Sequence, residues 1–326
     1  MISLDLELHW GVRDTRSVAE CRANFDGVYA AIPELLRVFD QWRIHATWAT
    51  VGMLFFETKR EFLACLPVMQ PNYVRRELSP YLDFDGLGDD YREDPYHFAP
   101  TLVRMIADSV NQEIGTHTFS HYYCLENGQT VDEFQSDLEA AIVTAKRYGI
   151  VLKSIVFPRN QYSSSHLEIC NRLGFNAYRG NPQDWFWRPR KASEDGLTRR
   201  AFRLLDAHLP ISGHNCWNTP QVPAGDHLVN VRASRVLRPV GKEITSLDSL
   251  RLHRIKTDMA YAAHRGRVYH LWWHPENFGI HLAPNLEFLG IILEWFDHLR
   301  RSEGMQSLNM GELAEAVRTA REPRIE

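Results

Sequence analysis

Two carboxylates stand close to the N-terminus, in the stretch SLDLELHWG. Asp5 and Glu7 are two residues apart in a segment that alternates like a strand, so their side chains point to the same face. Burying two like charges is costly unless a cation or a base shares the site. A solvated strand face is one interpretation. The apolar residues that alternate with the pair, with His9 beside it, make a functional site an equal alternative.

Two histidines, His117 and His121, follow an apparent strand in EIGTHTFSH. On one helical turn, side chains four residues apart are neighbours, ~5 to 6 Å apart at Cβ. Both could then reach one metal ion at ~2.0 to 2.1 Å from each imidazole nitrogen. Two histidines and one carboxylate are the ligands of a catalytic zinc-type site, which keeps a position open for water. With the early acidic pair, this spacing predicts such a site.

A further histidine, His274, ends the strand-like stretch in RVYHLWWHPENF. His270, Trp272 and His274 share one face by alternation, which also fits an aromatic core strand with a hydrogen-bonded histidine. A histidine at a strand end is equally suited to general acid catalysis, because its unperturbed pKa of about 6.5 allows it to protonate an amine leaving group near neutral pH.

Two more polar segments also follow strand-like stretches. VFPRNQYS contains Pro158, Arg159 and Tyr162, and GNPQDWFWRP contains Asp184 and Trp185. An arginine beside a buried carboxylate keeps it ionised, and a carboxylate behind a histidine fixes the tautomer of the imidazole. A surface loop and an aromatic core patch are the alternative interpretations.

The elements that must position these residues alternate between strand and helix. Strands are expected at 2–8, 46–51, 154–157 and 268–273. Helices are expected at 33–42, with Pro33 in the first turn, at 102–111, after Thr130 with its capping-box partner Glu133, at 165–173 and at 285–300. Such alternation predicts parallel βα units, in an open doubly wound sheet or a barrel. In both, function lies at the carboxyl ends of the strands, where the polar clusters fall.

One segment breaks this rhythm. Residues 73–100 are rich in Pro, Gly and Asp and show little periodicity, and a connection of this length is more often functional than idle. No repeat, low-complexity tract or Gly/Ser linker marks a boundary elsewhere. We therefore expect one α/β catalytic domain over 1–326 with an insertion or long loop around 73–100.

The bulk composition narrows the classes of partner. The 326 residues carry a formal net charge of −4, which gives no electrostatic footprint for nucleic acid or an anionic membrane. No apolar run approaches the ~20 residues of a membrane span, and the first residues do not resemble a signal peptide. The five cysteines form no Cys-x-x-Cys pair. A cytoplasmic protein with reduced thiols is the expectation.

Taken in order, the acidic pair, THTFSH, the Pro/Arg segment, the Asp-Trp segment and the late histidine resemble the motif series of the polysaccharide deacetylase (NodB-homology) family, carbohydrate esterase family 4. The resemblance runs from Ile2 to about Phe278, and THTFSH is its most specific part. It implies a distorted (β/α) barrel that hydrolyses N-acetyl or related acyl groups of amino sugars with a divalent metal, commonly zinc.

The resemblance also implies roles for single residues. Asp5 would be the general base, His117 and His121 metal ligands, and Asp184 the partner that tunes the acid His274. Candidates for binding the sugar are Trp185, Tyr162 and Pro158.

The chain departs from the family pattern at two motifs. Asp-Leu-Glu replaces the usual Asp-Asp, so the third metal ligand would be Glu7, with Asp5 or His9 as substitutes. Val-Phe-Pro-Arg replaces the usual Arg-x-Pro, so Arg159 would stand in for the family's arginine.

Three functions follow from these observations. The first is removal of an N-acetyl or N-formyl group from an amino sugar, acting on nucleotide-linked or lipid-linked precursors in surface-polysaccharide assembly. The second is hydrolysis of a ureido or cyclic amide compound, as in allantoinase-like relatives. The third is carbohydrate binding without catalysis. Zinc is the favoured metal, although iron, cobalt and nickel accept the same ligands.

Overall fold

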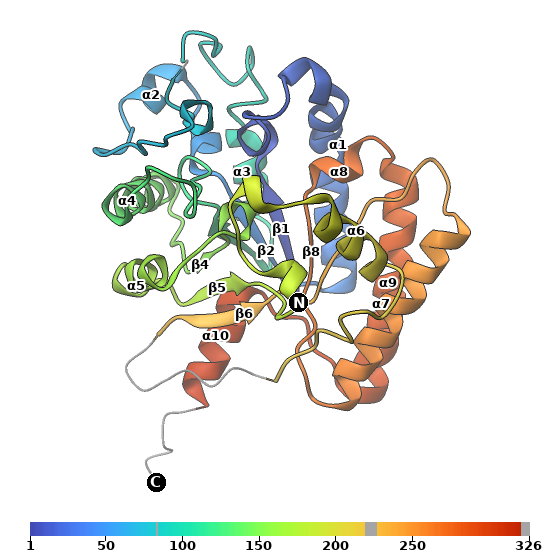
Figure 1. Ribbon diagram of the computed structural model, residues 1–326. Helices are drawn as coiled ribbons and strands as arrows, with labels where there is room; N and C mark the ends of the chain where they lie inside the picture. The colour runs from blue at the N-terminus through green and yellow to red at the C-terminus, as the bar shows by residue number, and fades with distance from the viewer. Residues whose placement is uncertain (83, 219–226, 321–326) are drawn as a thin grey trace.

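Eight parallel strands form the centre of the computed structural model, which describes residues 1–82, 84–218 and 227–320 (Figure 1). They are paired in the order β6-β5-β4-β3-β2-β1-β8-β7. Their bounds are β1 Ile2–Leu6, β2 Ala46–Thr50, β3 Gln112–Thr116, β4 Ser154–Ile155, β5 Ala177–Gly180, β6 Val229–Arg232, β7 Arg235–Val236 and β8 Leu271–Trp273. The strands β1 and β2 are buried along their whole length, as expected of a parallel sheet covered on both faces.

The sheet curls into a barrel because one segment occupies both of its edges. β6 pairs with β5, and β7 pairs with β8. Only two residues separate β6 from β7: Ala233 donates its N–H to the carbonyl of Gly180 (2.8 Å), and Ser234 donates to that of His270 (2.8 Å). The chain thus crosses from one edge of the sheet to the other. The predicted α/β fold, a distorted (β/α) barrel, is confirmed.

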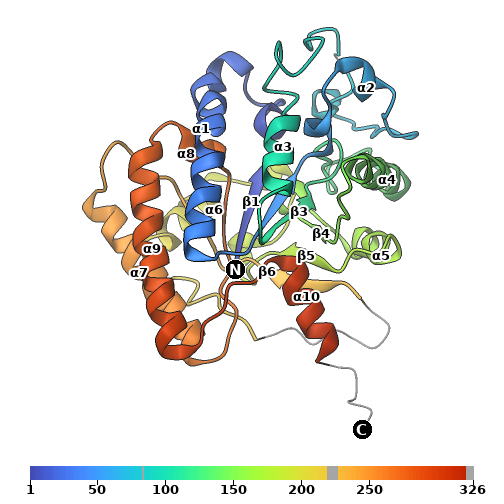
Figure 2. The same ribbon diagram turned by 180° about the vertical axis from the view of Figure 1, so that it is seen from behind.

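Helices surround the barrel, as Figures 1 and 2 show from opposite sides. Their bounds are α1 Val18–Trp42, α2 Lys59–Leu63, α3 Pro100–Ala107, α4 Val131–Arg147, α5 Ser164–Arg172, α6 Leu197–Asp206, α7 Ser246–His264, α8 Glu276–Gly279, α9 Leu282–Glu303 and α10 Met310–Thr319. Short 3₁₀ turns occupy Leu8–Gly11, Gly52–Phe55, Arg76–Leu78, Pro158–Asn160, Trp185–Trp187 and Ala192–Glu194. In the described part of the chain, no helix has the length and apolarity to cross a membrane.

The last helix closes the end of the barrel where the strands begin (Figure 2). Met310, Leu313 and Val317 of α10 pack into a cluster with apolar residues of β2, β5 and β6. The amide of Met310 donates to Thr47 Oγ1 (2.8 Å). Because this end is filled with side chains, the carboxyl ends of the strands are left to form the site.

The helix boundaries show where local sequence patterns are enough to predict the start of a helix. α4 begins as predicted, with Thr130 and Glu133 forming a complete capping box. α1 begins at Val18, fifteen residues before the predicted start, and Pro33 lies inside it. The true start is a second capping box, Ser17 with Glu20, and the packing of the helix compensates the hydrogen bond that Pro33 cannot make.

Within 73–82 and 84–100 the chain is mostly irregular: it contains the turn at Arg76–Leu78, an isolated β-bridge from Asp90 to Thr58 and the first residue of α3. It packs on loops that border the strand ends. Tyr73 accepts a hydrogen bond at its hydroxyl from the amide of Tyr123 (2.8 Å), and the carbonyl of Leu78 accepts one from Arg13 (2.7 Å). The long connection therefore buttresses the rim of the barrel.

A close contact between α1 and α8 fixes the chain that follows β8. A methyl group on Gly27 would lie 2.4 Å from the Cα of Gly279, so the two backbones touch. Asn24, one turn earlier, donates its side-chain amide to the carbonyl of Glu276 (3.1 Å). The register of α8 against α1 is thus set by glycine.

Gly27→Ala should lower the free energy of unfolding by about 1–3 kcal/mol, because backbone must move to admit the methyl group. Gly290→Ala is the matched control: Gly290 lies in α9 with nothing within 4 Å of the added methyl, so stability should rise by about 0.5–1 kcal/mol. Urea denaturation measures both. Equal effects in the two variants would contradict the close contact.

Candidate active site

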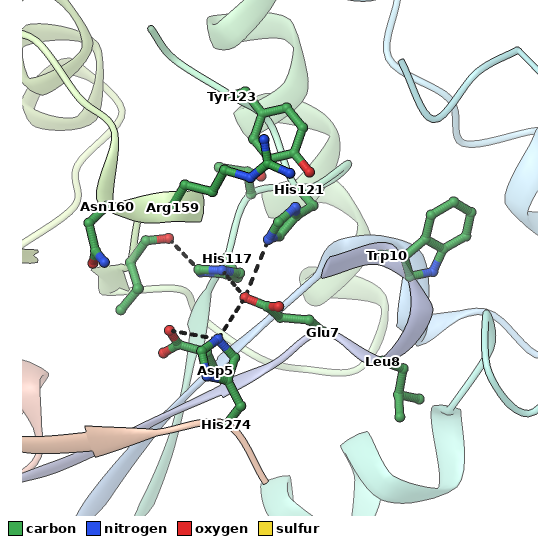
Figure 3. Close-up of polar contacts among 12 residues, drawn as sticks. Asp5, Glu7, Leu8, Trp10, His117, His121, Tyr123, Arg159, Asn160 and His274 are labelled. Atoms are coloured by element: carbon green, nitrogen blue, oxygen red, sulfur yellow. Dashed lines mark hydrogen bonds and ion pairs between the residues drawn. The ribbon is translucent and has the colours of Figure 1, made fainter. Parts of the chain in front are cut away.

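Three potential metal ligands converge at the carboxyl ends of β1 and β3 (Figure 3). Glu7 directly follows β1, and His117 directly follows β3. The Nε2 atoms of His117 and His121 lie 2.8 and 3.3 Å from Glu7 Oε1. All three residues are buried, and their ligand atoms lie within 4.8 Å of one another. The structure brings together the three residues predicted from sequence.

The hydrogen bonding of His117 fits a cation at this point. Its Nδ1 lies 2.8 Å from the carbonyl oxygen of Val156, which can only accept, so Nδ1 carries a proton. In a neutral imidazole, Nε2 then faces Glu7 with a lone pair, and a carboxylate oxygen is also an acceptor. Two acceptors at this distance require a proton or a metal ion between them. The donor set therefore fits a divalent metal.

His121 is suited to the same role by its protonation state. Burial lowers the pKa of His121 to about 4, although the Glu7 carboxylate opposes this effect. The imidazole is therefore neutral at neutral pH, which is the form that binds metal.

The two histidines lie in a loop and not on the helical turn that their spacing suggested. Thr118 and His121 both have left-handed backbone conformations, with φ of 64° and 56°. Asp137 of α4 holds this loop: it accepts hydrogen bonds from the amides of Phe119 (2.7 Å) and Ser120 (3.2 Å) and from the Ser120 hydroxyl. The rings of His117 and His121 still come within 5.1 Å, centroid to centroid.

Burial raises the pKa of Asp137 to about 6, against the hydrogen bonds from this loop. Sequence reasoning missed this residue. The available sequence signal was an aspartate beside Leu138, within the apolar stripe of α4. In the structure, Asp137 is fully buried.

Asp5 is held by an arginine that the sequence reasoning did not single out. Its carboxylate oxygens accept hydrogen bonds from Nη1 and Nη2 of Arg179, each at 2.6 Å. Arg179 lies in β5, is 1% exposed, and its guanidinium stacks 4.2 Å from the ring centre of Trp272. A bidentate pair of this kind fixes the orientation of the carboxylate. An arginine inside a short buried strand was the available signal.

The contact expected of Arg159 is thus made by Arg179. Arg159 instead pairs with Asp14, at 2.5 and 2.8 Å, and lies over the ring of Tyr123 (Figure 3). The reason is position along the chain. Arg159 comes after β4, in a turn with a left-handed φ of 53°, so it emerges at the rim of the barrel, whereas Arg179 points inward from a strand.

His274 completes the group from the end of β8. Its Nε2 lies 3.4 Å from Glu7 Oε1 and 3.9 Å from Asp5 Oδ2, and 31% of the side chain is exposed. Burial lowers the pKa of His274, but the carboxylates of Glu7, Asp5 and Glu276 outweigh this effect and raise it to about 9. One carboxylate oxygen of Glu7 therefore faces three imidazole nitrogens.

Glu276 holds the backbone of the turn that carries Glu7. Its Oε1 accepts hydrogen bonds from the amides of Glu7 (3.0 Å) and Leu8 (2.7 Å), and Leu8 has a left-handed φ of 48°. Burial raises the pKa of Glu276. This residue was also missed, although it stands two positions after His274 in the motif HPEN.

Two residues assigned through the resemblance lie outside the pocket. The carboxylates that act on His274 are Glu7, Asp5 and Glu276, so Asp184 is not the partner that tunes it. The chain leaves the barrel after β5, and Asp184 lies in that excursion, before the turn at Trp185–Trp187. Trp185 is 43% exposed and packs edge-on against Phe202 of α6.

The other candidates are displaced by one or two positions. Tyr162 is partly buried and packs against Phe157 and Tyr178, and Pro158 is buried, whereas their neighbours Arg159 and Asn160 line the pocket.

His9 is not available as the third ligand. Its Nδ1 bonds to His97 (2.7 Å) and its Nε2 to the carbonyl of Arg16 (3.0 Å). Asp5 lies within reach of Glu7 and His274, so those three form a second, overlapping group.

The group opens into a pocket of about 380 Å³, a volume within the usual range for small ligands. Asp5, Glu7, His121 and His274 line its floor, with Arg179 and Trp272 beside them. Three potential metal ligands, a carboxylate and an imidazole thus share one opening, and groups of these types are the ones used in metal-assisted amide hydrolysis.

Arg179→Gln should lower the free energy of unfolding by about 3–5 kcal/mol, because it leaves the buried Asp5 carboxylate without its cation. The control is Arg104→Gln, which removes the exposed pair with Glu57 and should cost less than about 1 kcal/mol. Urea denaturation at constant pH gives both values. A loss for Arg179→Gln no larger than that of the control would refute the proposed importance of the buried pair.

Three solved structures share this fold over nearly the whole chain. A putative polysaccharide deacetylase from Mycobacterium smegmatis is 12% identical, with a TM-score of 0.61 over 98% of this chain and 89% of that one. Puue allantoinase is 10% identical, with a TM-score of 0.54 over 99% and 90%. A probable polysaccharide deacetylase from Pseudomonas aeruginosa PAO1 is 9% identical, with a TM-score of 0.52 over 100% and 91%. At these identities the similarity concerns the fold.

The sequence itself matches a family model. Residues 21–178 match the polysaccharide deacetylase model, a span that contains both histidines of THTFSH and leaves Asp5, Glu7 and His274 outside. No curated protein sequence matches the chain. This match supports the conclusion that the protein is a hydrolase that acts on amide bonds. Over these residues, which make up just under half of the chain, the sequence is similar to the polysaccharide deacetylase family.

Proposed function

We propose that this protein is a divalent-metal-dependent hydrolase that removes an N-acetyl or N-formyl group from an amino sugar, in the assembly of surface polysaccharides. The observation that carries the proposal is the convergence of Glu7, His117 and His121 on one point, with Asp5 and His274 at the same opening. The match to the polysaccharide deacetylase model supports the reaction class.

Each residue has a distinct role in the proposed reaction. Glu7, His117 and His121 would hold the metal, which when bound, as Zn²⁺ or a similar ion, would supply Lewis-acid activation of the attacking water and the amide carbonyl. Asp5, oriented by Arg179, would accept the proton of the attacking water. His274, partly exposed toward the pocket, would give a proton to the departing amine nitrogen.

Hydrolysis of a ureido or cyclic amide substrate uses the same groups and is the second candidate. The fold shared with Puue allantoinase is the observation in its favour. A panel of N-acetyl sugars, N-formyl sugars and allantoin distinguishes the two. Release of acetate or formate supports the first candidate, and ring opening of allantoin alone supports the second. Sugar binding with no release in excess zinc would instead support the non-catalytic alternative.

Asp5→Asn should lower kcat/KM for acetate or formate release by about 10²–10⁴, because the amide cannot accept the proton. Asp184→Asn is the matched control and should stay near wild type, since Asp184 does not contact the catalytic group. Normal turnover in Asp5→Asn would remove the base from the mechanism. A deficit in Asp184→Asn equal to that of Asp5→Asn would restore the role implied by the resemblance.

His117→Ala should abolish stoichiometric metal binding, because it removes one of three ligands from a buried site. Metal-to-protein ratios measured by mass spectrometry after dialysis test this expectation. His253→Ala removes an exposed histidine and should leave the ratio unchanged. Metal retained in full by His117→Ala would exclude the assigned ligands.

A further inference from the structure

A second pocket, of about 470 Å³, adjoins the candidate active site. Arg159, Asn160 and Trp272 line both pockets, so a ligand can extend from one into the other. Seven of the side chains that line this second pocket are Arg or Lys, against two carboxylates, Asp14 and Asp195. We call it the arginine pocket. Its charge is opposite to that of the whole chain, which is −4.

The positive charge of the arginine pocket is only partly compensated by the protein. Asp14 pairs with Arg159, and Arg75 pairs with Glu77 outside the pocket (2.8 Å), while Asp195 is shared by Arg203 (2.5 Å) and Arg200 (3.4 Å). Arg188 and Arg190 are exposed and have no ion-pair partner within the described residues. These cations remain available to a ligand.

A neighbouring arginine is also affected by the close spacing of positive charges. Arg199, on α6 beside the pocket, stacks on Trp185 at 4.9 Å. Burial lowers the pKa of Arg199, and the charges of Arg190, Arg203 and Arg188 lower it further, although the Asp195 carboxylate opposes this effect. A concentration of cations that repel one another is favourable where an anion binds among them.

The number and type of the cations point to phosphate. Guanidinium groups bind phosphate oxygens in pairs of parallel hydrogen bonds, and arginine is favoured where such recognition matters. A single carboxylate, as in a uronic acid, would neutralise only one of the charges that the ion pairs of the pocket leave uncompensated, such as those of Arg188 and Arg190. A phosphate or diphosphate offers more charge and more acceptor oxygens.

We propose that the arginine pocket binds a phosphate or diphosphate group of the substrate, so that the amino sugar in the adjoining pocket is a glycosyl phosphate. This assignment rests on the proposed deacylation and specifies its substrate class. Nucleotide-linked and lipid-linked sugars carry the same phosphate chemistry. Exposed Leu204 and Leu205 on α6, next to the pocket, are a reason to test the lipid-linked form as well.

Equilibrium binding tests the assignment without depending on catalysis. Glucose 1-phosphate has no acyl group to remove, so its affinity for the metal-loaded protein, measured by calorimetry, is independent of turnover. It should bind more tightly than glucose, and raising the salt concentration should weaken it because the attraction is screened. Arg188→Gln/Arg190→Gln should raise its Kd by about tenfold or more, as expected for two lost charge-assisted contacts.

The control is Arg37→Gln/Arg60→Gln, which changes the net charge equally at exposed positions of α1 and α2 and should leave the Kd unchanged. Equal weakening in both double variants, or equal affinity for glucose and glucose 1-phosphate, would overturn the proposal.

Turnover separates this inference from the proposed function. N-acetylglucosamine 1-phosphate, UDP-N-acetylglucosamine and a short-chain polyprenyl-diphosphate N-acetylglucosamine are compared with neutral diacetylchitobiose. Arg188→Gln/Arg190→Gln should raise KM for the phosphorylated substrates and leave that for the neutral sugar unchanged. Preference for either the nucleotide or the lipid form supports the assignment and identifies its source. Deacylation of the neutral sugar with no advantage from phosphate would overturn the arginine pocket while preserving the deacylase.

Discussion

One carboxylate oxygen, Oε1 of Glu7, faces the Nε2 atoms of His117, His121 and His274 at 2.8, 3.3 and 3.4 Å. A charged group buried in this way is tolerated only when its partners are held in place. The surrounding structure meets that requirement through separate elements. Glu276 fixes the backbone of the turn at Glu7, and Val156 fixes the ring of His117. The close contact of α1 with α8 in turn sets the position of Glu276.

The barrel supplies these partners because all its strands run in the same direction. Residues after β1, β3 and β8 meet at one rim although they are more than a hundred positions apart in the chain. The opposite rim is filled by α10. The loops at the rim that carries the candidate site are not held by strand pairing. Buried carboxylates stabilise them instead. Asp137 pins the histidine loop by its amides, much as Glu276 pins the turn after β1.

In the proposed function, the groups for the reaction and those for substrate selection lie in two adjoining pockets. The pocket at Glu7 contains the groups that can attack an amide, and it is bounded by the buried pair Asp5–Arg179. The adjoining arginine pocket contains cations that the chain leaves available. Trp272 and Arg159 belong to both. A substrate that spans the two would be oriented by its charged end before its acyl group reaches the metal ligands.

The sequence by itself determined the βα alternation, the start of α4 and the residues that could bind metal, because these depend on periodicity, capping and residue type within a few positions. Residue spacing linked His117 and His121 to the early acidic pair, whereas the roles of Asp5 and His274 came from the order of motifs. The structure decided which partners surround them. Arg179 replaces Arg159, and Glu276 and Asp137 were not expected, while Asp184, Trp185 and His9 lie elsewhere. Such contacts depend on the direction in which each side chain leaves its strand or turn, and on the curl of the sheet. Neither can be predicted from the residues next to it in the sequence.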